Sequence, residues 1–131
     1  MHCGIVFDVS REEYKEKTDR LIRKLLSESD DKTEWSLIGF NSGAFILVEK
    51  KSKPIFSLDD IIYGGLSDLS IGLDAAKSCD SIYLISGQSV ATSGKTLSAS
   101  LPRVNCFCLG ESDEDVLTSL SFFTRGSYTK I

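Results

Sequence analysis

The hydrophobic positions of this chain fall into two patterns, short uninterrupted apolar runs and longer helical stripes. Residues 4–7 are apolar at every position, which is typical of a strand buried on both faces of a parallel sheet. From residue 11 to residue 26, tyrosine, leucine and isoleucine recur at helical spacing, and lysine and glutamate occupy the other face. The first unit of the chain is therefore predicted to be a buried strand followed by an amphipathic helix.

The same patterns continue to the end of the chain. Ser42 and Gly43 form a tight turn between two predicted strands, which indicates an antiparallel hairpin at a sheet edge. Ser57 opens a capping pattern that predicts one short turn of helix. The alternation predicts an α/β fold with a mostly parallel six-stranded sheet, an antiparallel edge hairpin and helices on both faces. Further strands are predicted at residues 34–41, 44–49, 81–86, 104–109 and 127–131, and further helices at 69–78, 96–101 and 112–123.

Composition and charge narrow the range of functions. The chain has 131 residues, of which 41% are hydrophobic and 26% are charged, and these values are typical of one globular domain spanning residues 1–131. The formal net charge is −4 and basic and aromatic residues do not interleave, so nucleic acid is not an expected partner. The sequence has no apolar run long enough to span a bilayer and no signal-peptide pattern, so membrane insertion is not expected.

The four cysteines indicate the redox environment. Cys3, Cys79, Cys106 and Cys108 show neither CxxC spacing nor the framework of a disulfide-rich domain. Cys106 and Cys108 lie two apart in a predicted strand, so both face the same side and are expected to be buried, reduced thiols. We therefore expect a cytoplasmic or other intracellular protein, and the chain is equally compatible with a place in a larger multidomain protein.

The large aromatic residues indicate where the core lies. They fall on predicted strand or helix faces, where core packing is the simplest interpretation. The residues expected in the core on this ground are Trp35, Phe40, Phe45, Phe107, Phe122 and Phe123.

A candidate site lies directly after the first predicted strand. Asp8 and Ser10 precede the helix at the carboxyl end of a central strand, where open α/β sheets bind ligands. A carboxylate that ends a buried strand costs free energy unless a partner stabilises it, and either a metal ion or the amides of the following helix would serve for Asp8. Ser10 and Glu13 also form an S-x-x-E capping box, so Ser10 is either a helix cap or a ligand.

In order and spacing, five segments of the chain resemble the von Willebrand factor A (VWA) domains. These segments are FDVS at the end of the first strand, the hairpin LIGFNSGAFILV, the loop GGLSDLSIGLDAA, the strand IYLIS, and the tail from VNCFCLG to SYTKI. The resemblance covers essentially the whole chain and implies a Rossmann-like, doubly wound fold. The family's hallmark is a metal-ion-dependent adhesion site, in which an Asp-x-Ser-x-Ser loop, a Thr and a further Asp hold Mg²⁺ or Mn²⁺. An acidic group of a partner protein completes the coordination of the metal.

Only some of the family's metal ligands have a counterpart in this sequence. Asp8 and Ser10 match the first two ligands, and Ser67 matches the Thr through its hydroxyl group. Glu12 stands in place of the second Ser, where its longer carboxylate is a further candidate ligand. Residues 85–88 contain no acid where the family places its last Asp. The site is therefore expected to be degenerate, with Mg²⁺ or Mn²⁺ held by Asp8, Ser10 and Ser67 as one expectation and a site without metal as the other.

The resulting functional expectation is a non-enzymatic protein–protein interaction module. A protein partner would bind the loops at the carboxyl edge of the sheet, either through a metal ion or by shape and hydrogen bonding. A structural scaffold domain whose metal site has decayed is one alternative, since fold alone does not fix function. The residues expected to contact the partner are Glu12, Gly65, Leu66, Asp68, Ser86, Gly87 and Gln88.

Two further alternatives involve phosphate groups. Residues 93–96 read Ser-Gly-Lys-Thr, like the end of a P-loop in a nucleotide-binding enzyme, but Ser89 stands where that motif needs a glycine. The helix N-terminus after Ser10 is the second candidate, as a phosphate- or phosphopeptide-binding site. His2, the only histidine, lies at the terminus and not opposite a nucleophile, so a Ser-His-Asp or Cys-His catalytic set is not expected.

Overall fold

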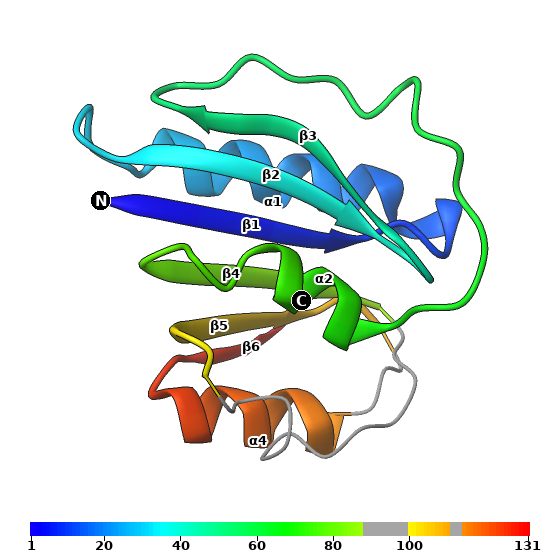
Figure 1. Ribbon diagram of the computed structural model, residues 1–131. Helices are drawn as coiled ribbons and strands as arrows, with labels where there is room; N and C mark the ends of the chain where they lie inside the picture. Colours follow the sequence, from blue (N-terminus) through cyan, green and yellow to red (C-terminus); the bar gives the residue numbers. More distant parts are fainter. Residues whose placement is uncertain (88–99, 111–113) are drawn as a thin grey trace.

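The computed structural model describes residues 1–87, 100–110 and 114–131 of the chain (Figure 1). The strands are β1 (His2–Asp8), β2 (Glu34–Phe40), β3 (Ala44–Lys51), β4 (Ser81–Ser86), β5 (Arg103–Cys108) and β6 (Tyr128–Lys130). The helices are the short 3₁₀-helix η1 (Glu12–Tyr14) and the α-helices α1 (Lys15–Ser27), α2 (Leu69–Ala75) and α4 (Glu114–Thr124).

All six strands form one sheet in the order β3-β2-β1-β4-β5-β6. Every neighbouring pair is parallel except β2 and β3, and β3 forms one edge of the sheet. The expected mostly parallel, six-stranded, Rossmann-like sheet with an antiparallel edge hairpin is therefore confirmed. The strand order reverses between β1 and β4, since β1 leads to β2 on one side and α2 leads to β4 on the other. Ligands of doubly wound sheets bind at such a switch point.

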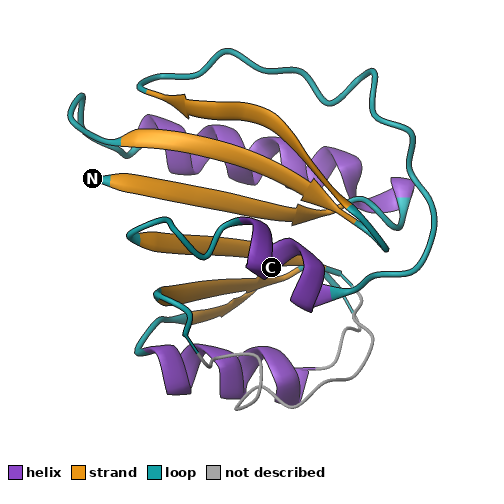
Figure 2. Ribbon diagram, viewed as in Figure 1, coloured by secondary structure: helices purple, strands orange, loops and turns teal. Residues whose placement is uncertain are grey.

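Helices cover both faces of the sheet (Figure 2). On one face, Ile22 of α1 belongs to a core cluster with Phe7 of β1. On the other face, Leu73 of α2 and Leu117 of α4 belong to a second core cluster with Val6 of β1. Because successive residues of a strand point to opposite faces, β1 contributes to both clusters, and six of its seven residues are buried.

Two glycines allow helices or turns to approach the sheet closely. A Cβ atom on Gly72 would lie 2.7 Å from the ring of Phe40, so α2 packs tightly on β2. A Cβ atom on Gly126 would overlap the backbone carbonyl group of Val104, so the turn from α4 into β6 runs directly against β5. Both positions need a residue without a side chain.

The start of α1 differs from the capping box expected at Ser10 and Glu13. The helix is preceded by η1, and neither Arg11 nor Tyr14, the N-cap residues of η1 and α1, makes a side-chain capping hydrogen bond. The N–H of Ser10 instead donates to Oδ1 of Asp8 at 2.8 Å. The capping-box interpretation of Ser10 is therefore wrong.

The turn of helix expected after Ser57 is only a hydrogen-bonded turn. The N–H of Asp59 donates to Oγ of Ser57 at 3.2 Å, and the N–H of Ile61 donates to the carbonyl of Leu58 at 3.2 Å. The connection of residues 52–68 contains no helix and packs Leu58 and Tyr63 into the core cluster beneath α1.

The aromatic residues are only partly in the core. Trp35 is buried as expected, whereas Phe45, Phe122 and Phe123 are 38%, 76% and 48% exposed, so their assignment to the core is wrong. The phenylalanines of α4 contact each other edge to face and cover no other ring among the described residues.

Three other expectations concern the whole chain. Cys106 and Cys108 are buried and free, as predicted, and Cys3 and Cys79 are buried and free as well. The helix predicted at residues 96–101 lies mostly outside the described residues. In the part of the chain that the structure describes, no helix has the length and apolar character needed to cross a membrane.

Candidate functional site

Asp8 is the centre of the candidate site. It is the last residue of β1 and is only 5% exposed. Its Oδ1 accepts the N–H of Ser10 at 2.8 Å, and its Oδ2 accepts the hydroxyl groups of Ser67 at 2.7 Å and Ser86 at 3.4 Å. Three segments that are distant in sequence, after β1, before α2 and at the end of β4, therefore converge on one carboxylate.

This carboxylate is stabilised by hydrogen bonds and not by a cationic side chain. None of the ion pairs formed between described residues includes Asp8. The side chains of Ser67 and Ser86 are buried with it, and a hydrogen bond to a charged group contributes about 1.5–3 kcal/mol. The side chain of Asp8 is thus held at the sheet edge by neutral donors.

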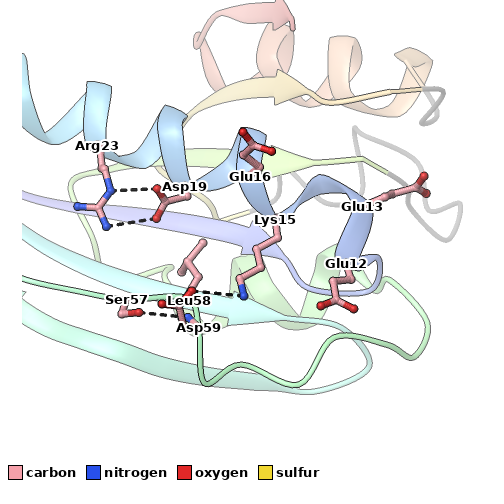
Figure 3. Close-up of a pocket in the computed structure, with 9 residues that line it drawn as sticks. All are labelled: Glu12, Glu13, Lys15, Glu16, Asp19, Arg23, Ser57, Leu58 and Asp59. Carbon is pink, nitrogen blue, oxygen red and sulfur yellow. Dashed lines mark hydrogen bonds and ion pairs between the residues drawn. The ribbon is translucent and has the colours of Figure 1, made fainter.

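The structure brings together three of the four residues expected to hold a metal ion. Asp8, Ser10 and Ser67 lie in one hydrogen-bonded group, to which Ser10 contributes its backbone N–H. Ser86, expected only as a partner contact, is the fourth member of this group. Glu12 is exposed in η1, and its side chain lines a groove beside α1 (Figure 3).

The other residues expected to contact a partner have different positions. Gly65 and Leu66 are exposed in the loop before α2, with Leu66 72% exposed. Asp68 is the N-cap of α2 and accepts a backbone hydrogen bond from the first turn of that helix. Gly87 is buried at the end of β4, whereas Gln88 lies outside the described residues.

The loop that displays Leu66 is fixed to the ends of β1 and β2. The N–H of Gly64 donates to the carbonyl of Val9 at 2.9 Å, and Nδ2 of Asn41 donates to the carbonyl of Gly64 at 2.9 Å. The N–H of Asp68 donates to the carbonyl of Asn41 at 3.0 Å. Gly64 has a φ of +148°, which glycine adopts without the steric cost that other residues incur. Asn41 was missed by the sequence analysis, although an asparagine directly before a Ser-Gly turn is a signal for such a role.

Tyr14 is a second residue that the sequence analysis missed. Its ring lies over the ends of β4 and β5, because a Cβ atom on Gly87 would lie 2.5 Å from the ring and one on Gly110 would overlap the hydroxyl group. The signal in the sequence is the pair of glycines that follow two buried strands. Tyr14 thus links the start of α1 to the carboxyl edge of the sheet.

The phenol of Tyr63 lies in a negatively charged environment beside the site. Its oxygen is buried and has no hydrogen-bond partner among the described residues. Burial raises the pKa of Tyr63 to about 12, and the negative charges of Asp19, Glu12 and Asp8 add to this effect. Tyr63 therefore stays neutral between carboxylates that belong to α1, η1 and β1.

A groove of about 530 Å³ lies between the first half of α1 and residues 57–59 (Figure 3). Nζ of Lys15 and Oδ1 of Asp59 pair across it at 3.5 Å, and Arg23 pairs with Asp19 at 3.0 Å. Five carboxylates and two cations line the groove, so its net charge is negative. Its lining residues are Glu12, Glu13, Lys15, Glu16, Asp19, Arg23, Ser57, Leu58 and Asp59.

His2 lies at the opposite, amino edge of the sheet and does contact two potential nucleophiles. Its Nε2 is 2.7 Å from Oγ of Ser36 and 3.8 Å from Sγ of Cys79, so the expectation that it lies away from any nucleophile is wrong. Burial raises the pKa of Cys79, and nearby Cys3 and Asp80 raise it further. Cys79 is therefore held as a thiol, which is the unreactive form in nucleophilic catalysis.

Known proteins were compared with the chain by sequence and by structure. No protein-family model and no curated protein matches the sequence. The ArnB paralog VWA2 from Sulfolobus acidocaldarius superposes with a TM-score of 0.75 at 19% identity, covering 100% of this chain and 41% of that one. BatB, a conserved hypothetical protein from Bacteroides thetaiotaomicron, superposes with a TM-score of 0.74 at 15% identity, covering 100% of this chain and 90% of that one.

A third solved structure connects this fold to a metal site. Proximal thread matrix protein 1 from the mussel byssus, with a zinc-occupied metal-ion-dependent adhesion site, superposes with a TM-score of 0.72 at 14% identity. The match covers 98% of this chain and 41% of that protein, so the chain spans about two fifths of its length. The chain has a VWA-like fold. At these identities the likeness establishes the fold, and the metal in that relative is a property of that relative.

Within residues 1–87, 100–110 and 114–131, the oxygen donors around Asp8 do not fit a resident divalent metal. Mg²⁺ and Mn²⁺ prefer several oxygen ligands including carboxylates, whereas the hydrogen-bonded group around Asp8 supplies one carboxylate, and both its oxygens already accept protein donors. No group of three His, Cys, Asp or Glu side chains in the described residues is placed to hold a metal ion. Glu12 reaches the groove and not this group.

Proposed function

We propose that this chain is a non-enzymatic protein-interaction domain whose partner binds the loops at the carboxyl edge of the sheet. The observation that carries the proposal is the convergence of three segments, after β1, before α2 and at the end of β4, on the buried carboxylate of Asp8. Hydrogen bonds to one central group hold these segments in a fixed relation, and a preorganised surface loses less conformational entropy on binding. A VWA-like fold is typical of protein-interaction modules, which supports this choice of function.

The exposed apolar side chains of this edge support a protein partner. Ile62 is 91% exposed and lies with Leu66 in the loop that Gly64 and Asn41 fix to the sheet. Apolar side chains that are held in solvent by an ordered loop are a frequent mark of a binding surface.

We further propose that binding needs no metal ion. Both carboxylate oxygens of Asp8 already accept protein donors, so a metal ion would compete with the hydroxyl groups of Ser67 and Ser86 for this carboxylate. The scaffold alternative, in which this edge binds nothing, is separated from the proposal by the binding experiment described below.

The two phosphate-based alternatives receive less support. Residues 93–96, the candidate P-loop, lie outside the described residues. The start of the first helix carries Glu12 and Glu13 in its first turn, and these carboxylates repel a phosphate group that the helix N-terminus would otherwise attract.

Four buried, free cysteines support an intracellular location, because exposure to an oxidising compartment favours disulfide-rich domains.

The test compares two substitutions of exposed apolar residues. Proteins captured on the immobilised chain are identified, and their affinities for wild type, Leu66→Asp and Phe122→Asp are measured by calorimetry. Leu66→Asp should weaken binding by about tenfold or more, as expected for an apolar anchor, while Phe122→Asp on α4 should leave binding unchanged. Thermal denaturation of both variants checks that the fold is intact. A partner that binds Leu66→Asp as tightly as wild type would place the interface elsewhere.

A further inference from the structure

We propose that the partner presents a basic side chain flanked by apolar side chains, with the basic group in the acidic groove beside α1 and the apolar groups on Ile62 and Leu66. This inference rests on the proposed function and names the chemistry of its partner. It differs from metal-bridged recognition, in which the partner contributes an acidic group.

The apolar surface and the acidic groove belong to one continuous segment of the chain. Asp59 forms part of the groove wall, Ile61 and Tyr63 pack into the core, and Ile62 between them faces solvent. The backbone contact of Gly64 with Val9 then brings this segment to the end of β1, three residues before Glu12. A single extended segment of a partner can therefore contact both surfaces.

The carboxylates of the groove are only partly neutralised. The two cations are already occupied, since Lys15 pairs with Asp59 and Arg23 pairs with Asp19. Neither Glu12 nor Glu16 forms an ion pair with another described residue. Figure 3 shows both side chains on the first turns of the helical segment, with Lys15 between them reaching toward the opposite wall. The groove thus keeps uncompensated negative charge beside a wall that contains the apolar side chain of Leu58.

The negative charge of the groove determines which charge a partner segment must carry. An acidic segment would be repelled by Glu12 and Glu16, which line the groove and form no ion pair with another described residue. A lysine or arginine would be attracted by the same carboxylates. The guanidinium group of an arginine can also form paired hydrogen bonds with a carboxylate. The effect of Asp8, Glu12 and Asp19 on the pKa of Tyr63 is consistent with a negative potential that extends from the groove to the sheet edge.

The experiment selects peptides from a random phage-displayed library on the immobilised full chain, in EDTA and separately in Mg²⁺. The enriched peptides should combine lysine or arginine with large apolar residues, in both conditions. A synthetic copy of an enriched peptide should bind about tenfold more weakly when Glu12→Gln and Glu16→Gln are combined, and more weakly as salt is raised. The matched control is Glu28→Gln, a substitution that removes one charge at the other end of α1 and should leave binding unchanged.

Three results would overturn the inference, and each can be distinguished from a failure of the proposed function. Enrichment of aspartate- or glutamate-rich peptides in Mg²⁺ alone, with binding lost in Leu66→Asp, would support an interaction site at this edge and reject a basic partner. A failure to enrich any basic, apolar peptide would also reject it, and the proposed function would then be judged by the Leu66→Asp comparison with captured proteins. Basic peptides that bind the Glu12→Gln and Glu16→Gln variant as tightly as wild type would show that the groove is not their site.

Discussion

Asp8 accepts hydrogen bonds from three segments, so its replacement tests how far this one side chain holds the carboxyl edge together. Asp8→Ala removes the acceptor that Ser10, Ser67 and Ser86 share and should lower the free energy of unfolding by about 2–3 kcal/mol. Urea denaturation followed by circular dichroism measures this change.

Asp68→Ala is the matched control for Asp8→Ala. Asp68 is also an aspartate beside the site, but its carboxylate accepts hydrogen bonds only from the N–H and the hydroxyl group of Ser70 in the first turn of α2, and loss of such an N-cap costs about 1 kcal/mol. If Asp8→Ala costs no more than Asp68→Ala, the three segments are held together by other contacts and the central role of Asp8 is wrong.

Tyr63 gives a second prediction for a single residue. Its buried phenol oxygen has no partner among the described residues, so Tyr63→Phe should leave the free energy of unfolding at pH 7 unchanged or raise it by up to about 1 kcal/mol. The folded-state pKa of about 12 exceeds the ordinary value of 10.0 for a tyrosine, so the neutral phenol is favoured in the folded protein. Its contribution to stability is fully present below pH 10 and is lost as the pH rises from about 10 through about 12.

The pH dependence separates this effect from those of the other tyrosines. Denaturation of wild type and Tyr63→Phe at pH 7 and pH 11 should show a smaller loss of stability for the variant at pH 11. An equal loss in both proteins would mean that Tyr63 titrates normally, and a variant clearly less stable at pH 7 would mean that the hydroxyl group has a stabilising partner.

Among the elements, β6 depends on a turn that only glycine can make. Gly126→Ala would place a Cβ atom against the carbonyl of Val104, and backbone atoms cannot move aside as a flexible side chain can. We expect a loss of about 1–3 kcal/mol in the free energy of unfolding, measured by thermal denaturation. Gly43→Ala is the control, because a Cβ atom there has no neighbour within 4 Å, and it should change stability by less than about 0.5 kcal/mol. Equal effects of the two substitutions would contradict close packing of this turn.

The order of the elements could be predicted because the apolar runs of the strands are local patterns. Residues 4–7 and 81–86 have no polar position in their interiors that would suggest an exposed face, and both are central strands in the structure. The start of α1 could not be predicted, because the N–H of Ser10 is taken by Asp8, and an S-x-x-E pattern does not reveal this competition. The exposure of Phe122 and Phe123 depends on which side of α4 meets the sheet, which a weakly amphipathic helix does not specify.

The candidate site could be predicted only as far as it depends on single positions. Asp8 follows from the end of a buried strand, and Ser67 from the family resemblance. The hydrogen bond from Ser86, the cover provided by Tyr14 and the anchoring role of Asn41 all arise from contacts between distant segments. The acidic groove likewise forms only when the connection after β3 packs beside α1, and no local pattern in that connection reports its course.

For the molecule as a whole, the decisive measurement is a thermal melt with and without divalent metal. We expect the melting temperature in EDTA to be unchanged by Mg²⁺ or Mn²⁺, because Asp8 is the one carboxylate in its hydrogen-bonded group and both its oxygens already accept protein donors. A metal present at 100 times its dissociation constant would stabilise the folded state by about 2.7 kcal/mol, which corresponds to a shift of several degrees. Asp8→Asn serves as the control, and a shift in wild type that is absent from Asp8→Asn would establish a working metal site.

The burial of all four thiols has a practical consequence for labelling the protein. Burial raises the pKa of Cys3 and Cys79, and raises that of Cys106 to about 11, so at neutral pH these side chains are not the thiolates that attack maleimides. A cysteine introduced at Ile62, in full contact with solvent, would take up a fluorophore much faster than the native ones. The wild-type chain therefore serves directly as the background for optical reporters, and the first of them can be attached to the loop that a partner would cover.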